Sequence, residues 1–499
     1  MYRNRKDPSQ VELQFVDFKS PFGEKLRADN RWVRLSEIIP WDSFEEEYSS
    51  KFGTTGNPAI PFRVALGSLI IKERCNFTDE DTVEHIHENP YLQYFVGFTQ
   101  YSEERPFNPS MMTYFRKRIS SDMLCAINEK IVLKNEDKRE DDDCDDDIHD
   151  DEPRKGKMII DATCVPEDIR YPTDASLLNE ARELTERVID ILWAHHPHRN
   201  NVRKPRTYRQ LARKHFCSFI KLKRPSRKRI RKEVKTQLQY VKRNLKTINT
   251  MKSDVPLTCL DTNLYRKLLV IHELYRQQSE HFKSIGKKNR SIRNRIVSIS
   301  KPHVRPIVRG KASGDTEFGA KISVSLIDGK MFLDRLSWDA FNEGGDLISQ
   351  SKAYRRRTGF YPESIHADKI YRNRENLRWC KSRNIRLSGS PLGRPSKDLV
   401  KNKLLKKLIR EDEGVRNAVE GAFGVCKRRY GLSRLLTKLK STSETTVALI
   451  ILAINLGKIL KDLFVFIFKR MPELVITVFR NSKTIATKIS RTDAIIMTN

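Results

Sequence analysis

The sequence predicts a mixed α/β protein with an all-helical N-terminal region and a large basic helical insert. Apolar runs of strand length occur at residues 157–163, 322–336 and 364–367, and longer stretches with helical apolar spacing lie between them. The resulting order is strand, large helical insert, antiparallel pair, helix, strand, helix, a brief strand at residues 385–387 and a last helix, which is typical of a mixed sheet covered by helices. Before residue 135 only helical patterns occur.

Length and charge narrow the class of protein. At 499 residues the chain exceeds one ordinary domain, so we expect two or three compact units. Lys and Arg total 95 against 64 Asp and Glu, and a formal charge of +31 predicts a polyanionic partner, DNA or RNA first. The eight cysteines form no Cys-x2-Cys pair, which favours reduced thiols in a cytosolic protein. No apolar run follows the N-terminal residues, so we expect no signal peptide.

Residues 1–135 are the predicted N-terminal helical domain. The stretch from Pro61 to Lys72 is apolar enough for a buried helix, and Thr78 has the capping chemistry that starts a second one. A proline after Asn89 ends that helix. Basic residues at 116–118 favour a DNA-binding module, although a helical dimerisation or packing domain fits the pattern nearly as well.

Residues 136–154 form an acidic linker. From 136 to 152 there are twelve Asp and Glu and only two basic residues. Because such a block repels itself, we expect it to be solvated and disordered. No rigid scaffold accompanies these carboxylates, which disfavours a metal site there.

Residues 173–300 are predicted to form a basic helical insert. Between residues 203 and 246 there are eighteen Lys and Arg and a single Glu233. A solvated face is the plain alternative, but so much positive charge is costly without an anionic partner, so we expect this surface to track DNA phosphates. The residues expected to contact DNA here are Arg227, Lys228, Arg229, Arg231 and Lys232.

Asp161 ends the central apolar run. A strand holds the side chain at its end with little freedom, which a metal-binding carboxylate requires, although Asp is also a common turn residue there. Two more carboxylates have comparable positions. Asp368 follows the short strand 364–367, and Glu420 lies on a helix predicted from Asp412 to Tyr430. Three carboxylates from separate elements can hold two Mg²⁺ about 4 Å apart.

Two cations accompany Glu420 on the predicted helix. Arg416 and Lys427 are spaced so that all three side chains fall within about 40° of one stripe. A Glu between two cations is often only a surface ion pair. The presence of Asp161 and Asp368 favours a functional site instead.

Four stretches carry motifs that occur together in one known family. They are residues 62–119, with Asp79-Glu80, Glu88 to Tyr91, Gln93 to Phe98 and Asn108 to Arg118; Asp161-Ala162-Thr163 followed by Ile169 to Asp174; Ala367 to Tyr371; and Arg416-x3-Glu420-Gly-x-Phe423-Gly424-x2-Lys427 to Leu432. This ordered set, spanning most of residues 30–460, resembles the DDE transposases of bacterial insertion sequences, the group typified by insertion sequence five.

The resemblance implies an RNase H-like catalytic core, at residues 155–435, that cleaves DNA and then transfers strands. By this resemblance Asp161, Asp368 and Glu420 are the catalytic metal ligands for two Mg²⁺, with Mn²⁺ as a substitute. It further implies that the protein acts as a homodimer on double-stranded DNA, which includes both the element ends and the target. It also implies a cytoplasmic, nucleoid-associated location. The basic residues implied to contact DNA beside the metals are Arg416, Lys427, Arg428 and Arg429.

One position departs from the family pattern. The extended signature of related transposases is Tyr-x2-Arg-x3-Glu-x6-Lys, and Arg416, Glu420 and Lys427 fit it. Glu413 stands at the Tyr position. A hairpin-forming excision step that relies on that Tyr is therefore not predicted from the sequence.

Residues 436–499 are predicted to hold a C-terminal helix and a tail without an interpretable pattern. The run Val447 to Ile454 is apolar, but Asn455, Lys458 and Lys461 interrupt it too soon for a membrane span. A helix packed in the core is the better interpretation, and we expect no membrane association.

Three functions remain open from the sequence. The first is an active transposase. The second is a non-catalytic or regulatory DNA-binding relative, which would retain the basic surface and tolerate loss of a carboxylate. The third is a metal-dependent nuclease without strand transfer, which the same carboxylates would serve. All three carboxylates are present, which favours activity.

Overall fold

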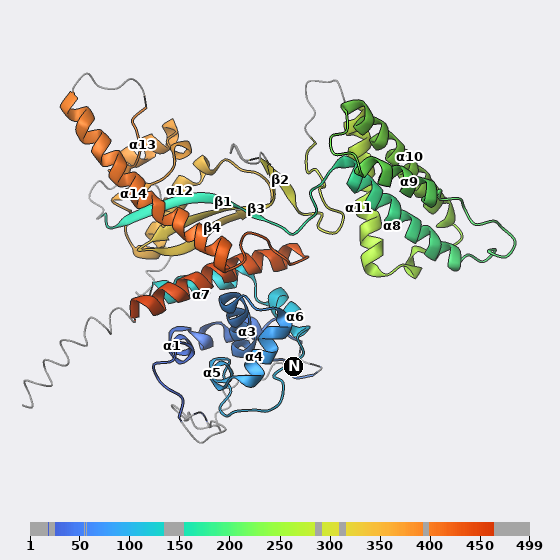
Figure 1. The fold of residues 1–499 in the computed structure, drawn as a ribbon. Helices are drawn as coiled ribbons and strands as arrows, with labels where there is room; N and C mark the ends of the chain where they lie inside the picture. Colours follow the sequence, from blue (N-terminus) through green and yellow to red (C-terminus); the bar gives the residue numbers. More distant parts are fainter. Residues whose placement is uncertain are drawn as a thin grey trace, which may run out of the picture.

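The computed structural model describes Phe18 and residues 25–53, 55, 57–133, 154–284, 292–308, 316–392 and 399–463. Nearly all of the predicted acidic linker, and the tail after residue 463, lie outside the described residues. Figure 1 shows a group of short N-terminal helices, a mixed sheet with helices against it, and a separate group of long helices. This is the mixed α/β architecture that the sequence predicts.

The N-terminal region is helical, as predicted. Thr78 forms a capping box with Asp81 at the start of α4, and Asn89 caps α5, which begins at Pro90. The elements are α1 (Arg31–Ile38), η1 (Trp41–Phe44), α2 (Glu45–Ser49), α3 (Phe62–Cys75), α4 (Asp79–Glu88), α5 (Pro90–Phe95), α6 (Met111–Arg118) and α7 (Ser121–Val132).

The sheet has the strand order of an RNase H-like core. Its strands are β1 (Lys157–Pro166), β2 (Arg305–Val308), β3 (Thr316–Ile327), β4 (Lys330–Ser337), β5 (Ser364–His366) and β6 (Arg386–Leu387). The order is β2-β3-β1-β5-β6, with β4 also paired to β3. β1 is antiparallel to β3 and parallel to β5, which is parallel to β6. Asp328 and Gly329 both have positive φ and make the predicted tight turn between β3 and β4.

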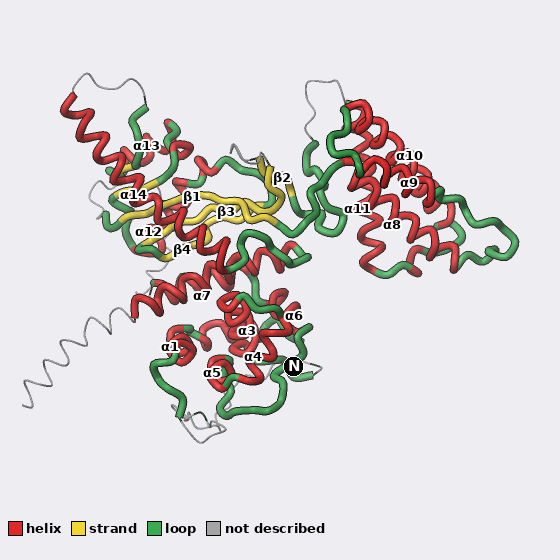
Figure 2. The backbone as a smooth tube through the Cα atoms, in the orientation of Figure 1, coloured by secondary structure: helices red, strands yellow, loops and turns green. Residues whose placement is uncertain are grey.

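Alternate side chains of β1 and β3 face two different layers of helices. Ile159 and Val324 belong to the cluster that includes Val419 and Cys426 of α14 (Leu399–Arg429). Met158 and Ile160 belong to the cluster on the other face. That face is covered by α12 (Leu347–Thr358) and α13 (Arg374–Ser382). The short turn η3 (Glu343–Gly345) precedes α12, and η4 (Lys369–Tyr371) lies between β5 and α13. Figure 2 shows helices beside the strands of this sheet.

The predicted start of α14 is wrong. The helix begins at Leu399, thirteen residues before the predicted Asp412. Residues 399–411 contain strong helix formers and no proline or glycine, so no signal ends the helix before Asp412. Val400 and Leu404 are exposed in this first part, so packing on the sheet is not what makes it helical.

A helix at residues 440–463 joins the N-terminal region to the sheet. Its Leu449 and Leu452 belong to the N-terminal core, whereas its Ile450 and Ile454 belong to the core beneath the sheet. The predicted core-packed helix is therefore confirmed. No helix in the described part of the chain has the length and apolar character required to cross a membrane.

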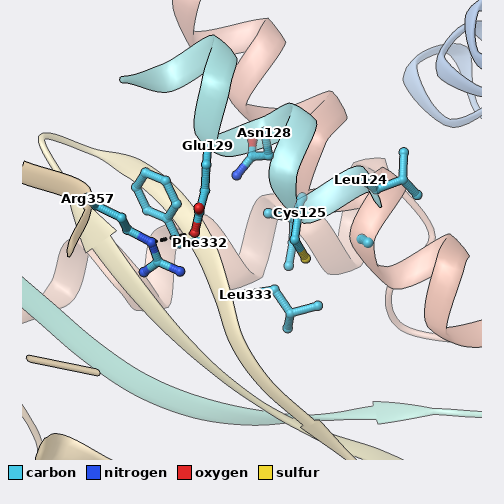
Figure 3. Close-up of a pocket in the computed structure, with 9 residues that line it drawn as sticks. Leu124, Cys125, Asn128, Glu129, Phe332, Leu333 and Arg357 are labelled. Atoms are coloured by element: carbon cyan, nitrogen blue, oxygen red, sulfur yellow. Dashed lines mark hydrogen bonds and ion pairs between the residues drawn. The ribbon is translucent and has the colours of Figure 1, made fainter. Parts of the chain in front are cut away.

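Polar contacts fix the same junction. Asn455 Nδ2 donates to Met331 O at 2.7 Å and to Asn128 Oδ1 of α7 at 2.8 Å. Arg357 of α12 donates from Nε to Glu129 Oε1 of α7 at 2.7 Å, and Figure 3 shows this pair beside Phe332. Because these groups are buried or half-buried, they fix α7 against the sheet at specific positions.

The predicted insert is a group of helices with a core of its own. Leu178, Val241 and Ile271 are among the fully buried residues of this core. Its elements are α8 (Asp174–Ala194), α9 (Arg209–Ile220), α10 (Arg227–Met251), η2 (Leu257–Cys259) and α11 (Thr262–Lys283). The chain enters the insert after β1 and returns to the sheet before β2.

His303, just before β2, should make the protein sensitive to acid. Burial, together with the positive charges of Lys301, Arg305 and Lys440, lowers the pKa of its imidazole to about 4. The ring packs edge-on against Trp338, with 4.4 Å between centroids. Because the folded-state pKa lies below the unfolded value, this contribution to stability is present above about pH 6.5 and is lost as pH falls towards 4.

The variant His303→Phe should therefore lose less stability than the unchanged protein between neutral pH and about pH 4.5. Urea unfolding at both pH values measures this, with His215→Phe, at an exposed position of α9, as the matched control. An equal loss of stability in His303→Phe and in the unchanged protein would contradict the assignment.

Candidate catalytic and DNA-binding site

The pairing of β1 with β5 brings two candidate carboxylates to the same level. In the parallel register Ile159 lies opposite His366, the last residue of β5. Asp161 and Asp368 follow Ile159 and His366 by two residues each. The register therefore places both of them just beyond the end of β5. Asp368 is the N-cap of η4, and its carboxylate accepts a hydrogen bond from Lys369 N at 2.7 Å.

Asp161 is a half-buried carboxylate. Burial, together with the negative charges of Glu343 and Asp368, raises its pKa to about 6. A hydrogen bond from Ala162 N at 2.8 Å and the charge of Arg416 act in the opposite direction without compensating. At neutral pH this is a desolvated negative charge with too little positive charge around it, which a bound cation would relieve.

Arg416 holds the other two candidate carboxylates. Its Nη1 lies 3.6 Å from Asp368 Oδ1, and its Nη2 donates to Glu420 Oε1 at 3.2 Å. Both carboxylates are more than half exposed, whereas the Arg416 side chain is about one quarter exposed. Within the described residues, no three His, Cys, Asp or Glu side chains are arranged to hold a metal ion in this geometry.

Helix α14 is fastened to the ends of β5 and β6 through Asp412. The buried Asp412 carboxylate accepts two hydrogen bonds from Arg386, at 2.7 and 2.8 Å. Its Oδ1 also lies 3.3 Å from Nδ1 of His366. Since Glu420 follows Asp412 by about two helical turns, this contact sets where Glu420 stands above the sheet.

Lys427 contacts β1. Its Nζ donates to Thr163 Oγ1 at 3.0 Å, and the residue is half-buried. Thr163 is two residues from Asp161 on the same strand, so both side chains lie on the face that α14 covers. Arg428 and Arg429, the next residues, are exposed.

Comparison with known proteins identifies the family. Residues 365–457 match the family model described as "Transposase DDE domain", and residues 20–118 match "Transposase domain (DUF772)". The two matches indicate an insertion-sequence DDE transposase. The first match includes Asp368, Arg416, Glu420 and Lys427, whereas Asp161 and the insert lie outside both matched ranges.

A relative in Rhizobium meliloti is described as "Uncharacterized protein ORF8 in nfe locus". It is 28% identical to the transposase over 186 residues, which are 36% of this chain and 80% of the relative. No solved structure matches the chain.

Glu343 is a carboxylate near the transposase site that sequence reasoning missed. It lies in η3, and Nζ of Lys321 stands 2.6 Å from its Oε2. It is the first of the neighbouring charges that raise the pKa of Asp161. In the sequence Glu343 belongs to a polar, glycine-containing turn, and nothing local distinguishes it from a loop residue.

The turn with Glu343 is packed against the segment that follows Asp368. A Cβ on Gly344 would lie 2.5 Å from Ile370 O, so glycine is required for this close approach. Asn376 Nδ2 donates to Gly344 O at 2.7 Å and to Tyr371 O at 2.8 Å. These contacts limit how far η4, and with it Asp368, can move.

The insert presents basic side chains at the start of α10. Residues 226–232 are exposed at every position, so the first two turns project beyond the bundle. Arg231 also stacks over the ring of Phe282, 5.4 Å from its centroid. The five insert residues predicted to bind DNA, Arg227, Lys228, Arg229, Arg231 and Lys232, all lie in this projecting segment. In Figure 1, α10 lies in the group of long helices, apart from β1.

The contact between Lys427 and Thr163 allows the role of Lys427 to be tested. If Lys427 contacts DNA, Lys427→Ala should leave folding intact and lower cleavage of an end-containing DNA about tenfold or more. Thr163→Val removes the hydroxyl that accepts this hydrogen bond and keeps Lys427, so it should change cleavage little. Gel-based cleavage assays and thermal unfolding of both variants measure this.

Equal losses of cleavage in Lys427→Ala and Thr163→Val would instead mean that Lys427 acts by fixing α14 to β1. Unchanged cleavage in both variants would remove Lys427 from the site.

Proposed function

We propose that this transposase binds the ends of an insertion sequence, cleaves the DNA by two-metal hydrolysis of phosphodiester bonds, and joins the 3′-hydroxyl ends to target DNA by transesterification. The observation that supports this most is the shared level of Asp161 and Asp368 at the end of β5, with Glu420 tied to Asp368 through one guanidinium. A nuclease or strand-transfer centre requires carboxylates from separate elements in such proximity.

Asp161, Asp368 and Glu420 would hold two Mg²⁺, or Mn²⁺ as a substitute. The chemistry of these donors fits, because carboxylate oxygens are the preferred ligands of Mg²⁺ and Asp161 lacks sufficient positive charge around it. When bound, the ions would activate the attacking hydroxyl and stabilise the leaving oxygen. Arg416 neutralises Asp368 and Glu420 in the structure, so its guanidinium would have to turn away from them for both to become ligands.

DNA would contact the projecting start of α10 and the exposed end of α14. Exposed Arg and Lys in both segments supply positive charge that phosphates neutralise, consistent with the formal charge of +31. The N-terminal domain, residues 1–135, would bind DNA as a unit, because its core is continuous with the helix that supports the sheet. Since an insertion sequence has two ends, two copies of the chain acting as a homodimer would process them together.

The carboxylates give the direct test of this function. Asp161→Asn, Asp368→Asn and Glu420→Gln should each lower cleavage and joining of an end-containing duplex at least about a thousandfold, because each removes a charged donor that the others cannot replace. DNA binding should remain within about twofold of that of the unchanged protein, because these residues do not hold phosphates. Glu411→Gln, an exposed position on α14, is the matched control and should retain activity.

Joining must be followed separately from cleavage in the same assay. Cleavage without joining by the unchanged protein would make it a nuclease, and DNA binding without either reaction would make it a regulatory relative. Comparable cleavage by all three carboxylate variants would remove the two-metal mechanism.

Arg416 provides a test that does not depend on activity. Without DNA, Arg416→Gln should bind Mn²⁺ several-fold more tightly than the unchanged protein, because a cation that competes for Asp368 and Glu420 is removed. Titration calorimetry or the electron spin resonance of free Mn²⁺ measures this affinity.

Arg428→Gln is the matched control for charge, since Arg428 is exposed on the same helix and should leave Mn²⁺ affinity unchanged. If Arg416→Gln binds Mn²⁺ as weakly as the unchanged protein, or more weakly, Arg416 positions the two carboxylates rather than competing for them.

A further inference from the structure

A row of lysines runs along the exposed side of α10. Its positions follow one another in alternating steps of four and three residues, so the side chains fall within about 80° of one another around the helix. The row consists of Lys228, Lys232, Lys235, Gln239, Lys242 and Lys246, all of them exposed. We call it the lysine row. It extends about 27 Å, because each residue of an α-helix adds about 1.5 Å.

The lysine row has no counter-charge in the part of the chain that the structure describes. None of its ammonium groups forms an ion pair there. The acidic residues of α10 and α11 have other partners. Glu233 is buried and accepts a hydrogen bond from Gln237 at 2.8 Å, and Arg276 pairs with both Glu273 and Glu280. Because like charges one turn apart repel one another, the row is unfavourable until a polyanion neutralises it.

The inner end of the lysine row borders an open groove between α10 and α11. The groove has a volume of about 450 Å³. Its lining consists of Lys242, Leu245, Lys246, Asn249 and Thr250 of α10 and of His272 and Tyr275 of α11. No carboxylate is among these residues. Leu245 belongs to the core of the insert, so the groove lies directly on the packed bundle.

The polar groups of the groove are donors suited to phosphate oxygens. Lys242 and Lys246 supply ammonium groups, and Asn249 and Tyr275 supply an amide and a hydroxyl. Within the described residues, none of these four side chains has a hydrogen-bond partner. The hydroxyl of Thr250 is different, because it donates to the carbonyl oxygen of Lys246 at 3.2 Å. The free donors therefore lie on one side of the groove entrance and across from it on α11.

We propose that the lysine row and this groove together bind the backbone phosphates of duplex DNA without regard to base sequence. Lysine ammonium groups are point charges on flexible stems, and contacts to phosphates fix the position of a duplex without reading its bases. A row of about 27 Å corresponds to roughly eight base-pair steps of B-DNA. Both strands border each groove of a duplex, so a straight row can reach phosphates of both.

This site rests on the proposed DNA-binding function and states where on the insert the duplex lies. DNA would follow α10 from its projecting start to the groove beside Tyr275, instead of contacting the start alone. In Figure 1, α10 lies apart from the strands that carry the candidate carboxylates. The insert would therefore hold DNA at a distance from the bond that is cut.

The double variant Lys242→Gln/Lys246→Gln tests the inner end of the row. Both residues are exposed, so the thermal unfolding midpoint should stay unchanged or rise. Binding should weaken about tenfold or more at 0.1 M salt, equally for an end-containing duplex and for a random one. The slope of log affinity against log salt should fall by about 1.8, the contribution of two phosphates.

The matched control is Lys204→Gln/Arg276→Gln. It removes the same charge from the insert, but at positions that already pair with carboxylates. Its slope should fall by less than half as much. Equal slopes in the two double variants would mean that only the net charge of the insert matters, which would overturn the site. A loss confined to the end-containing duplex would overturn its independence of sequence.

A further comparison separates this site from the proposed function. If the unchanged protein shows no salt-dependent DNA binding, the proposed function fails. A variant with Ala at Arg227, Lys228, Arg229 and Arg231 should also lower the slope. If it does so while the Lys242/Lys246 double variant has the slope of the unchanged protein, DNA contacts only the start of α10, and the site proposed here fails alone.

Hydroxyl-radical footprinting tests whether the duplex lies along α10. On an end-containing duplex, Lys228→Gln/Lys232→Gln and Lys242→Gln/Lys246→Gln should each lose protection in a separate block. The blocks should be at most about six base pairs apart, because the centres of the two pairs lie about 21 Å apart on the helix. Loss at the same positions in both variants, or in neither, would overturn a duplex lying along the row.

Tyr275→Phe tests the groove separately from the charges. It should weaken DNA binding about threefold and leave the salt slope unchanged, because a neutral hydroxyl donor releases no counterion. Tyr265→Phe, at an exposed position of α11 outside the groove lining, is the matched control and should bind as the unchanged protein does. Unchanged affinity in Tyr275→Phe, or an equal loss in both variants, would overturn the groove as a phosphate site.

Discussion

Helix α14 is fastened to the sheet at two polar points, and the position of Glu420 depends on both. Near its middle, Asp412 is held by Arg386 and lies against His366, two residues before Asp368. Near its end, Lys427 reaches Thr163, two residues after Asp161. Each contact therefore ties the helix to a strand that carries a candidate carboxylate. Between the two points Val419 and Cys426 are fully buried against the sheet, so the helix cannot rotate without losing apolar burial.

Charge is left uncompensated at two places in the structure, on β1 and on α3, with opposite signs. Asp161 is a desolvated carboxylate whose pKa is raised, and Arg74 is a desolvated guanidinium whose pKa is lowered. Each arrangement costs folding stability, because the charged form lacks a partner in a region with little water. A divalent cation would relieve the first. The protein thus gives up stability at the point where a ligand of the opposite charge is proposed to bind.

The local patterns in the sequence were sufficient for most of the fold. The alternation at Ile322, Val324 and Leu326 predicted β3, and Asp328-Gly329 predicted its turn, because period and turn chemistry act over a few residues. The insert was equally clear, since its helices have apolar stripes. The start of α14 was missed because no capping or breaking residue marks Asp412, and the helix simply continues upstream to Leu399.

The site was predictable only in part, for a different reason. Asp161, Asp368 and Glu420 could be proposed because each ends or follows a recognisable element, and their assignment as metal ligands remains a prediction. Glu343 could not be found, because its proximity to Asp161 arises from the packing of one turn on another, with Gly344 against Ile370. Arg416 was expected at DNA, whereas in the structure it contacts two carboxylates, and local spacing alone could not distinguish these partners.

The N-terminal region and the catalytic core are best understood as parts of one structure. Helix 440–463 contributes Leu452 to one core and Ile454 to the other, and its Asn455 bonds both α7 and β4. A rotation of the N-terminal helices would break these apolar and polar contacts together, so these helices keep a fixed position relative to the sheet. A DNA duplex bound by both regions would then meet the carboxylates in one register. Helix 440–463 would therefore set the distance between the proposed DNA-binding surface and the candidate carboxylates.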